Sequence, residues 1–328
     1  MQRRSGPLLT EGTALTHLDE EQILARILPL YDRPAWLVVP PGDDAAVLHT
    51  SDRTIATTDS MVLGRDWLDE WSSGADVGHK VIAQNLADIA AMGGRPTGVL
   101  LTLVIDPAVS IEWVTDLAKG VAGACSRADV AVLGGDLSSA PPGVVMVSVT
   151  ALGVLVGEPV LRSGARPGNH VAVAGSLGLS DAGLRLLQEG RPEADPEAVA
   201  VHRRPRPPLD QGLAAVAAGA TAMLDVSDGL LRDAGRIARA SGVILDLDPT
   251  ALDDDIDRLT PVVGVQAARE CVLAGGEEHA LLATFVPGSV PGGWRVIGVA
   301  RGIAPDEGPE VLVGGLSETL TGWDHFRP

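Results

Sequence analysis

The stretch that decides the fold is "DVGHKVIAQNLADIAAMGG" at residues 76–94, which "GVLLTLVI" follows at residues 98–105. The first segment carries apolar residues at helical spacing and ends in two glycines, a common stop signal for a helix. The second segment is a short apolar run that reads as a strand. The same alternation continues with a helix predicted over 110–128 and a strand over 129–136. Strands alternating with helices predict an α/β fold.

The alternation divides the chain into a leader and two domains. We expect a disordered leader at residues 1–17, an N-terminal domain at 18–160 and a C-terminal α/β domain at 161–328. A Pro- and Arg-rich connection at 191–210 lies inside the second domain. A chain of 328 residues with 45% hydrophobic content is long enough to build two cores of ordinary size.

The charge balance excludes several classes of partner. The chain has 43 acidic and 25 basic residues, a formal net charge of −18. Nucleic acids and anionic membranes both need a basic footprint, so we expect neither as a partner. Only Lys80 and Lys119 are lysines, and few ammonium groups are therefore available to a polyanionic substrate.

Cysteine usage and hydropathy favour a cytoplasmic protein. Cys125 and Cys271 are far apart and each stands in an apolar stretch, which suits reduced thiols and leaves no disulfide framework. No apolar segment typical of a signal peptide follows the first residues. The longest apolar stretch, at 144–157, is shorter than a membrane span.

Acidic residues recur where the predicted elements end. They are Asp43, Asp44, Asp59, Asp88, Asp136, Asp225, Asp228 and Glu277. Each taken singly is explained by a turn or a cap. Asp88 is harder to explain, because it shares a helix face with Asn85 near the helix C-terminus, where the macrodipole disfavours an anion. A bound cation would compensate it, and hard cations such as Mg²⁺ prefer oxygen ligands, which hydroxyl groups also supply.

Three glycine-containing stretches are candidates for contact with phosphate. "LGGDLSS" at 133–139 places two glycines and an acid after an apolar strand, which suits either a phosphate site or a tight turn. "LDVSDGLL" at 224–231 puts Asp225 and Ser227 on one side of an extended segment and Asp228 at a helix start, where it also suits a cap. "GSLGLSDAG" at 175–183 is a possible phosphate loop without the Walker A lysine.

No signature of a nucleophilic hydrolase or zinc enzyme is present in the sequence. An acidic, lysine-poor chain with oxygen ligands at its element ends binds a polyphosphate only through divalent metals. This is the logic of a phosphoryl-transfer site.

Eight motifs carry a resemblance to a known family. In order they are "PGDDAAV", "TTD", "QNLADIAAMGGRP", "GGD", "LRSGARPG", "DVSDGLLRD", "GGEEHALL" and "GWDHF". Their order resembles that of the thiamine-monophosphate kinases, from about residue 20 to the end. That family is similar in fold to aminoimidazole-ribonucleotide synthetase and selenophosphate synthetase. The resemblance implies two α/β domains and a homodimer with a β-barrel-like interface between N-terminal strands. It also implies ATP-dependent phosphorylation of thiamine monophosphate to thiamine diphosphate, by direct in-line transfer with several Mg²⁺ ions.

The resemblance assigns site residues by position. The implied Mg²⁺ ligands are Asp44, Thr57, Thr58, Asp59, Asp88, Asp136, Asp225 and Asp228. The implied ATP contacts are Gly135, Asp136, Arg162 and Ser227. The implied substrate contacts are Asp66, Glu277, which would hydrogen-bond the aminopyrimidine, and Trp323, which would stack on it. Arg162 also suits a solvated turn and Trp323 a core anchor.

The sequence departs from the family pattern at four places. Asp66 and Trp67 replace a usual His-aromatic pair, and Leu137 follows "GGD" where Thr is common. "GGEEHALL" replaces a Glu-Asp-Tyr-Glu run, and Trp323 replaces Tyr. An anion at position 66 facing a substrate phosphate needs a metal or Arg65 between them.

Two other functions stay open from the sequence. One is an ATP-dependent enzyme of the same superfamily with a different substrate, although no lysine precedes Lys80, which disfavours selenophosphate synthesis. The other is a non-catalytic nucleotide-binding regulator.

Overall fold

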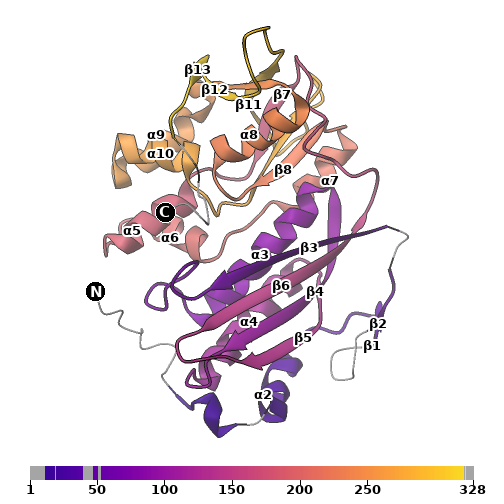
Figure 1. Ribbon diagram of the computed structural model, residues 1–328, viewed down its shortest axis with the longest axis vertical. Coiled ribbons are helices and arrows are strands. Elements are labelled where there is room, and N and C mark those ends of the chain that lie inside the picture. The colour runs from indigo at the N-terminus through magenta and orange to yellow at the C-terminus, as the bar shows by residue number, and fades with distance from the viewer. Residues whose placement is uncertain (1–11, 19, 40–46, 51–52, 321, 323–328) are drawn as a thin grey trace. The chain divides into compact units, whose positions relative to one another are not determined.

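The computed structural model describes residues 12–18, 20–39, 47–50, 53–320 and 322 (Figure 1). They form two compact units. Unit 1 comprises the described parts of Met1–Ile89 and Pro96–Val154, and unit 2 those of Ala90–Arg95 and Leu155–Pro328. The mixed α/β architecture predicted from the sequence is confirmed.

Unit 1 is built on a four-stranded sheet with the order β3-β6-β4-β5. The strands are β3 (Thr54–Val62), β6 (Val145–Leu155), β4 (Gly94–Ile105) and β5 (Ala131–Ser139). Strand β3 pairs antiparallel with β6, and β4 pairs parallel with β5. Helices α3 (Gly74–Ala91) and α4 (Ile111–Arg127) cover one face of this sheet (Figure 1).

Helices α3 and α4 pack closely because small residues line their contact. A Cβ atom at Gly78 would lie 2.2 Å from the carbonyl oxygen of Leu117, and one at Gly120 would lie 2.2 Å from that of Ala75. Ser110 caps α4 by accepting the backbone N–H of Trp113 at 3.2 Å. These contacts fix α3, and with it Asp88.

Short elements precede the sheet of unit 1. They are η1 (Leu15–His17), α2 (Glu20–Ile27), η2 (Leu28–Leu30), β1 (Leu37–Val39) and β2 (Val47–Leu48). The expectation of a disordered leader is wrong for Thr13 to His17. Leu15 is buried and donates its N–H to the carbonyl of Val109 at 2.9 Å, and Ile111 donates to Thr13 at 2.8 Å.

The sequence predicts a strand that ends just after its glycines, at residue 136. Strand β5 instead continues to Ser139. Its register against β4 shifts between Val99 and Leu100. At this irregularity the backbones approach so closely that a Cβ atom at Gly135 would lie 1.7 Å from the carbonyl oxygen of Leu101. The second glycine of "GGD" is therefore required by strand packing.

Unit 2 is built on a seven-stranded sheet with the order β13-β12-β9-β11-β7-β10-β8. The strands are β7 (His170–Ala174), β8 (Ala222–Val226), β9 (Ile244–Leu247), β10 (Ala280–Phe285), β11 (Arg295–Arg301), β12 (Val311–Val313) and β13 (Leu316–Ser317). The helices are α5 (Leu179–Gln188), α6 (Pro196–Arg203), α7 (Leu209–Ala217), α8 (Leu230–Ser241), η3 (Pro249–Leu252), α9 (Asp253–Val263) and α10 (Val265–Ala274).

Both faces of the unit 2 sheet are covered. Val171 and Val173 of β7 belong to one buried apolar cluster, whereas Ala172 and Ala174 belong to another. Successive side chains of a strand point to opposite faces, so the sheet lies between two cores. Burial on both sides explains why all five residues of β8, including Asp225, are buried.

Among the described residues, no helix combines the length and apolar character that crossing a bilayer requires.

Candidate functional site

Thr57 and Asp88, two of the predicted ligands, are in direct contact in unit 1. The hydroxyl Oγ1 of Thr57 donates to Oδ2 of Asp88 at 2.8 Å. Thr57 lies on β3 and Asp88 on α3, one turn before the helix ends. Asp59 follows Thr57 by two residues and therefore points to the same, helix-covered face of β3. The structure thus brings Thr57, Asp59 and Asp88 to one side of the sheet.

Asn85 places an oxygen one helical turn before Asp88. Its side chain is completely buried, and its Nδ2 donates to the carbonyl of Val81 at 2.8 Å. Exchanging the amide nitrogen and oxygen would set two acceptors against each other, so this contact fixes the amide orientation. The remaining Oδ1 has no hydrogen-bond partner among the described residues. A buried acceptor without a donor fits a place for a cation or a water.

Thr58 and Asp136 lie on the opposite face of the same sheet. Thr58 is one residue out of phase with Thr57, and its hydroxyl donates to the carbonyl of Val149 at 2.9 Å. Asp136 is in register with Thr102, which faces the side away from the helices, and accepts from the Ser138 hydroxyl at 2.8 Å.

The sheet also separates Thr57 and Asp136 laterally. They lie on the two edge strands, β3 and β5, about 14 Å apart at three strand spacings. Within the described residues, no three His, Cys, Asp or Glu side chains converge on one point. Thr57 and Asp136 therefore do not meet within the described part of unit 1. Asp43, Asp44 and Trp323 lie outside the described residues.

Asp66 closes the turn that follows β3. Its Oδ2 accepts the backbone N–H of Val62 at 2.7 Å, and Gly64, with φ +80°, donates to the carbonyl of Trp67 at 2.8 Å. The turn brings Trp67 into the core, where its exposed fraction is 5%. An aspartate at this position has a local reason, since Asp side chains stabilise turns by binding backbone N–H groups.

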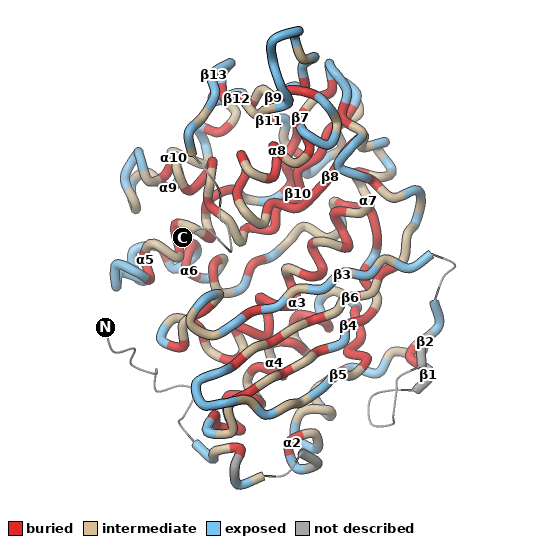
Figure 2. Tube along the Cα trace, in the orientation of Figure 1, coloured by how far each residue is buried: buried red, intermediate tan, exposed pale blue. Residues whose placement is uncertain are grey.

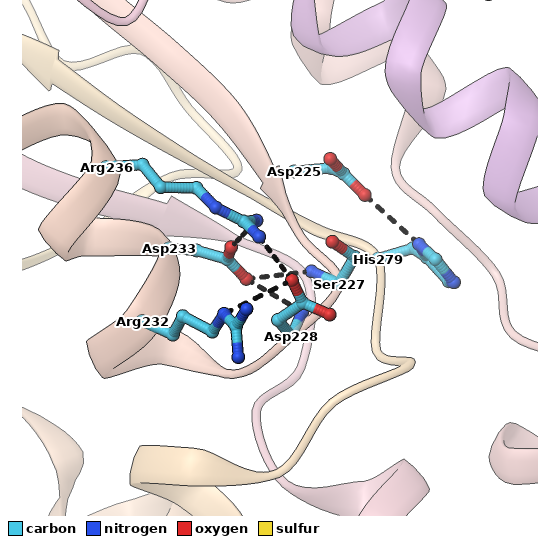
Figure 3. Close-up of polar contacts among 7 residues, drawn as sticks. All are labelled: Asp225, Ser227, Asp228, Arg232, Asp233, Arg236 and His279. Carbon is cyan, nitrogen blue, oxygen red and sulfur yellow. Dashed lines mark hydrogen bonds and ion pairs between the residues drawn. The ribbon is translucent and has the colours of Figure 1, made fainter. Parts of the chain in front are cut away.

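In unit 2, a group of charged side chains surrounds the end of β8 and the start of α8 (Figure 3). Asp225, in β8, is buried, and its Oδ2 lies 3.1 Å from Nδ1 of His279. Ser227 follows the strand, and Asp228 precedes the N-cap residue of α8, Gly229.

Asp233 holds the turn between β8 and α8, a role that the sequence analysis did not assign. Its side chain is fully buried, and its Oδ2 accepts the backbone N–H groups of Ser227 at 3.0 Å and of Asp228 at 2.9 Å. Burial raises the pKa of this carboxyl to about 7, although Arg236 opposes the shift. The signal in the sequence was an acid in the first turn of a predicted helix, four residues after the glycine of "SDG".

Two arginines of α8 contact the Asp228 carboxylate. Arg236 donates to Oδ2 of Asp228 and also to Oδ1 of Asp233, so its guanidinium bridges two carboxylates. Nε of Arg232 lies 3.6 Å from the same Oδ2 of Asp228. Asp228 therefore faces protein cations, whereas Asp225 faces a histidine (Figure 3).

Glu277 lies in a strained turn that is tied to the end of β8. Glu277 and His279 have φ values of +61° and +56°, uncommon for residues other than glycine. Their N–H groups donate to the carbonyls of Ser227 at 2.8 Å and of Val226 at 2.9 Å. A Cβ atom at Gly276 would lie 2.6 Å from the carbonyl oxygen of Ser227. The predicted contacts Ser227 and Glu277 are therefore neighbours.

The stretch at 175–183 is not an open phosphate loop. Glu278, which is buried, accepts from the Ser176 hydroxyl at 2.5 Å and from the backbone N–H of Ser180 at 2.9 Å. Desolvation raises the pKa of this carboxyl. The N-terminus of α5 thus binds an anion supplied by the protein, and the possibility of a phosphate site there is wrong.

Arg162 lies away from this group within unit 2. Its side chain is exposed, and its carbonyl accepts from the Ser241 hydroxyl at 2.8 Å. Ser241 is the last of the 12 residues of α8, and Asp228 precedes the first. A helix of this length spans about 18 Å, so the backbone of Arg162 lies near the opposite end of α8 from Asp228.

Known proteins resemble this chain in sequence and in structure. The model of the AIR synthase related protein N-terminal domain matches residues 42–155. Thiamine-monophosphate kinase of Mycobacterium tuberculosis is 42% identical over 332 residues, which cover 99% of this chain and 97% of the relative. The enzyme of that name from Corynebacterium glutamicum is 41% identical over 78% of this chain and 80% of its own length.

Solved structures agree with these relatives. Thiamine-monophosphate kinase from Stenotrophomonas maltophilia K279a has a TM-score of 0.77 at 30% identity and covers 91% of this chain and 96% of its own. AaThiL complexed with AMPPCP and TMP has a TM-score of 0.76 at 31% identity, over 87% of this chain and 91% of its own. The hydrogenase maturation protein HypE in complex with ATP, at 16% identity and a TM-score of 0.72, shares the fold.

The fold is that of the AIR synthase related proteins, whose N-terminal domain model matches residues 42–155. Within that class, the identity along the whole chain decides the assignment. The chain belongs to the thiamine-monophosphate kinase family.

Proposed function

We propose that this protein transfers the γ-phosphoryl group of ATP to thiamine monophosphate, giving thiamine diphosphate for thiamine biosynthesis. The observation that carries the proposal is the contact between Thr57 and Asp88, one helical turn from the buried Oδ1 of Asn85, which has no partner among the residues that the structure describes. These side chains supply oxygen donors for a cation. The chain is 31% identical to AaThiL, whose structure contains AMPPCP and TMP.

The donors fit magnesium by their chemistry. Carboxylates, a hydroxyl and an amide oxygen are hard ligands, which Mg²⁺ prefers. Thr57, Asp59 and Asp88 of unit 1 and Asp225 of unit 2 are the described residues best suited to hold the ions. Asp44, Asp136 and Asp228 are further ligands that the family resemblance implies, whereas Thr58, whose hydroxyl donates to Val149 on the other face of β3, is left out of the proposed set. Mg²⁺ held by these residues would neutralise the charge of the phosphate oxygens.

Direct transfer is supported by the state of the cysteine thiols. Cys125 and Cys271 are both buried. Burial raises the pKa of Cys125 to about 12 and raises that of Cys271 as well. Neither thiol is a thiolate near neutral pH, so neither serves as a nucleophile. The protein's contribution is then to position the two substrates.

The turn before α8 favours phosphate binding through a metal ion rather than through backbone N–H groups. The N–H groups of Ser227 and Asp228 already donate to Asp233. A phosphate at this turn would have to meet side chains, such as the hydroxyl of Ser227, or a cation held by Asp225. Gly135, Asp136 and Arg162 are the further ATP contacts of the proposal.

Glu277 and Trp323 form the thiamine side of the proposed site, and Asp66 is retained there as a candidate from the resemblance. The position of Gly322 supports a contribution of Trp323, the next residue, to substrate binding. A Cβ atom at Gly322 would lie 2.0 Å from the carbonyl oxygen of Asp228, so the described end of the chain rests on the turn before α8.

A homodimer formed through unit 1 is part of the proposal. The face of the sheet that α3 and α4 leave open carries Thr58 and Ser60 of β3, Ser148 and Thr150 of β6, and Leu100 of β4. Strand β3 is coloured mostly as exposed or intermediate in Figure 2. These five side chains are uncharged in a chain of net charge −18, although Asp136 of β5 lies on the same face. A neutral, partly apolar face suits contact with a second copy. The net charge of −18 supports a protein without nucleic-acid or membrane partners, and the two free cysteines support a cytoplasmic location.

The activity is tested by measuring ADP formation with Mg²⁺ and ATP. The acceptors are thiamine monophosphate, thiamine and an aminoimidazole ribonucleotide, and chromatography identifies the product. We expect turnover with thiamine monophosphate alone, giving thiamine diphosphate. Turnover with another acceptor only would identify a different enzyme of the superfamily. ATP binding without turnover would identify a nucleotide-binding regulator.

A further inference from the structure

His202 is a buried histidine to which the sequence analysis gave no role. It lies in α6, inside the Pro- and Arg-rich connection at 191–210, and its exposed fraction is 5%. Its Nδ1 lies 3.4 Å from Oε2 of Glu277 and 3.4 Å from Oγ of Ser180. The connection therefore brings a ring nitrogen to the carboxylate proposed to bind the substrate.

The chemistry of the contact fixes which group donates. An ionised carboxylate only accepts hydrogen bonds, so a bond to Glu277 places the proton on Nδ1 of His202. The Ser180 hydroxyl shares the same nitrogen at the same distance. The backbone N–H of Ser180 donates to Glu278. The start of α5 is therefore connected to Glu278 directly and to Glu277 through His202.

The backbone and the side chain of Glu277 are held by different groups. The backbone, at φ +61°, is fixed by the hydrogen bond to Ser227. A residue in the left-handed region costs on the order of 1–3 kcal/mol and persists only where its surroundings hold it. The side chain has three rotatable bonds of its own, and its Oε2 lies 3.4 Å from Nδ1 of His202. That side chain is 37% exposed while the His202 ring is 7% exposed, so a ligand can reach a carboxylate that a buried group orients.

We propose that His202 is a positioning residue that aims the Glu277 carboxylate at the exocyclic amine of an aminopyrimidine substrate. This inference rests on the proposed function. An amine N–H needs an acceptor in a fixed direction, and a carboxylate that rotates loses that direction. Partners that orient a binding group from behind change affinity or activity by about 10- to 100-fold when removed. His202 thereby contributes to specificity without touching the substrate.

The test uses thiamine monophosphate and its analogue in which an oxo group replaces the 4′-amine. A site built to accept a hydrogen bond from the amine discriminates against the analogue. The variants are His202→Leu, which removes the donor, His202→Asn, which keeps an N–H donor, and Ser180→Ala as the matched control. The quantity compared is kcat/KM for thiamine monophosphate divided by kcat/KM for the analogue. We expect His202→Leu to lower this ratio by about tenfold, because KM for thiamine monophosphate rises. KM for ATP should not change. His202→Asn should recover part of the ratio, and Ser180→Ala should keep it.

Each outcome decides a different claim. A wild-type protein that does not phosphorylate thiamine monophosphate overturns the proposed function. A wild type that phosphorylates both substrates equally overturns the role of Glu277. A wild type that discriminates, with an unchanged ratio in His202→Leu, overturns the role of His202 alone. Equal losses with ATP and with thiamine monophosphate, together with a lower Tm, would show that His202 only packs α6.

Discussion

The hydroxyl of Thr57 donates to the carboxylate of Asp88 at 2.8 Å, although 31 residues separate them in the chain. The contact joins β3 to α3 and leaves the lone pairs of the hydroxyl oxygen facing away from the carboxylate. An oxygen in this arrangement is oriented by the protein before any ligand arrives. Thr58, the next residue, points to the other side of the sheet.

This relationship predicts different effects for two adjacent, chemically identical substitutions. We expect Thr57→Val to lower kcat/KM by about 10- to 100-fold and to raise the Mg²⁺ concentration for half-maximal rate, because an oriented oxygen is lost. Thr58→Val should change neither quantity. Steady-state rates across a Mg²⁺ series measure both. Equal damage from the two substitutions would show that both faces of β3 serve the metal.

Gly322 is predicted to be intolerant of a methyl group. Its Cβ would lie 2.0 Å from the carbonyl oxygen of Asp228, so Gly322→Ala should displace the end of the chain from this turn. We expect KM for thiamine monophosphate to rise by at least about tenfold, since a small displacement of a positioned group has effects of this size or larger.

Gly308→Ala is the matched control for Gly322→Ala, because its Cβ meets nothing within 4 Å. Its kinetics should be those of the wild type. If Gly322→Ala also behaves as the wild type, the end of the chain does not contribute to substrate binding.

The open face of the unit 1 sheet is predicted to hold two copies together. Leu100 is 41% exposed on that face, and Leu100→Asp would place two like charges near a symmetric interface. We expect sedimentation velocity to show a dimer for the wild type and a monomer for this variant. Val286→Asp changes an exposed valine of unit 2 in the same way and should stay dimeric. A wild-type monomer would refute the interface directly.

Asp195 is predicted to make the stability depend on pH. It caps α6 by accepting the N–H of Ala198 at 3.1 Å, and Arg258 donates to it at 2.6 Å. The hydrogen bond from Arg258 lowers the pKa of this carboxyl. A lowered pKa contributes stability above the pKa of the unfolded chain, about 3.9, and that contribution is lost as pH falls through the folded pKa.

Two substitutions of Asp195 separate the cap from the charge. Asp195→Ala removes both and should reduce the free energy of unfolding by about 1 kcal/mol or more at pH 7. Asp195→Asn keeps a good cap and should lose less. Urea unfolding at pH 7 and pH 3 measures the difference between the wild type and Asp195→Asn, which should shrink at pH 3. A constant difference would mean that the ion pair with Arg258 does not contribute.

The sequence was sufficient to predict elements whose spacing is regular. The helical period at 76–94 corresponds to α3, and the apolar run at 98–105 corresponds to the C-terminal part of β4. Asp88 was singled out because an acid near the C-terminus of an apolar helix needs a compensating cation, and the order of the family motifs assigned Thr57 and Asp59. These inferences depend on local pattern, which the chain shows directly.

The rest of the site depends on register and on long-range contacts. Which face Asp136 occupies follows from its pairing with Thr102, and no local pattern fixes that pairing. Asp233 and His202 act on residues that lie 5 and 75 positions away, through a turn and through a buried connection. Their roles appear only once the backbone has brought Glu277 and Ser227 together.

The irregularity at Gly135 has a consequence for the behaviour of the protein at high concentration. A strand from another molecule can extend a sheet only where it meets a straight, unbroken row of backbone donors and acceptors. At β5, which ends the sheet of unit 1, the shifted register and the exposed acid at Asp136 interrupt that row. Amyloid-like growth by strand addition is therefore disfavoured at this border.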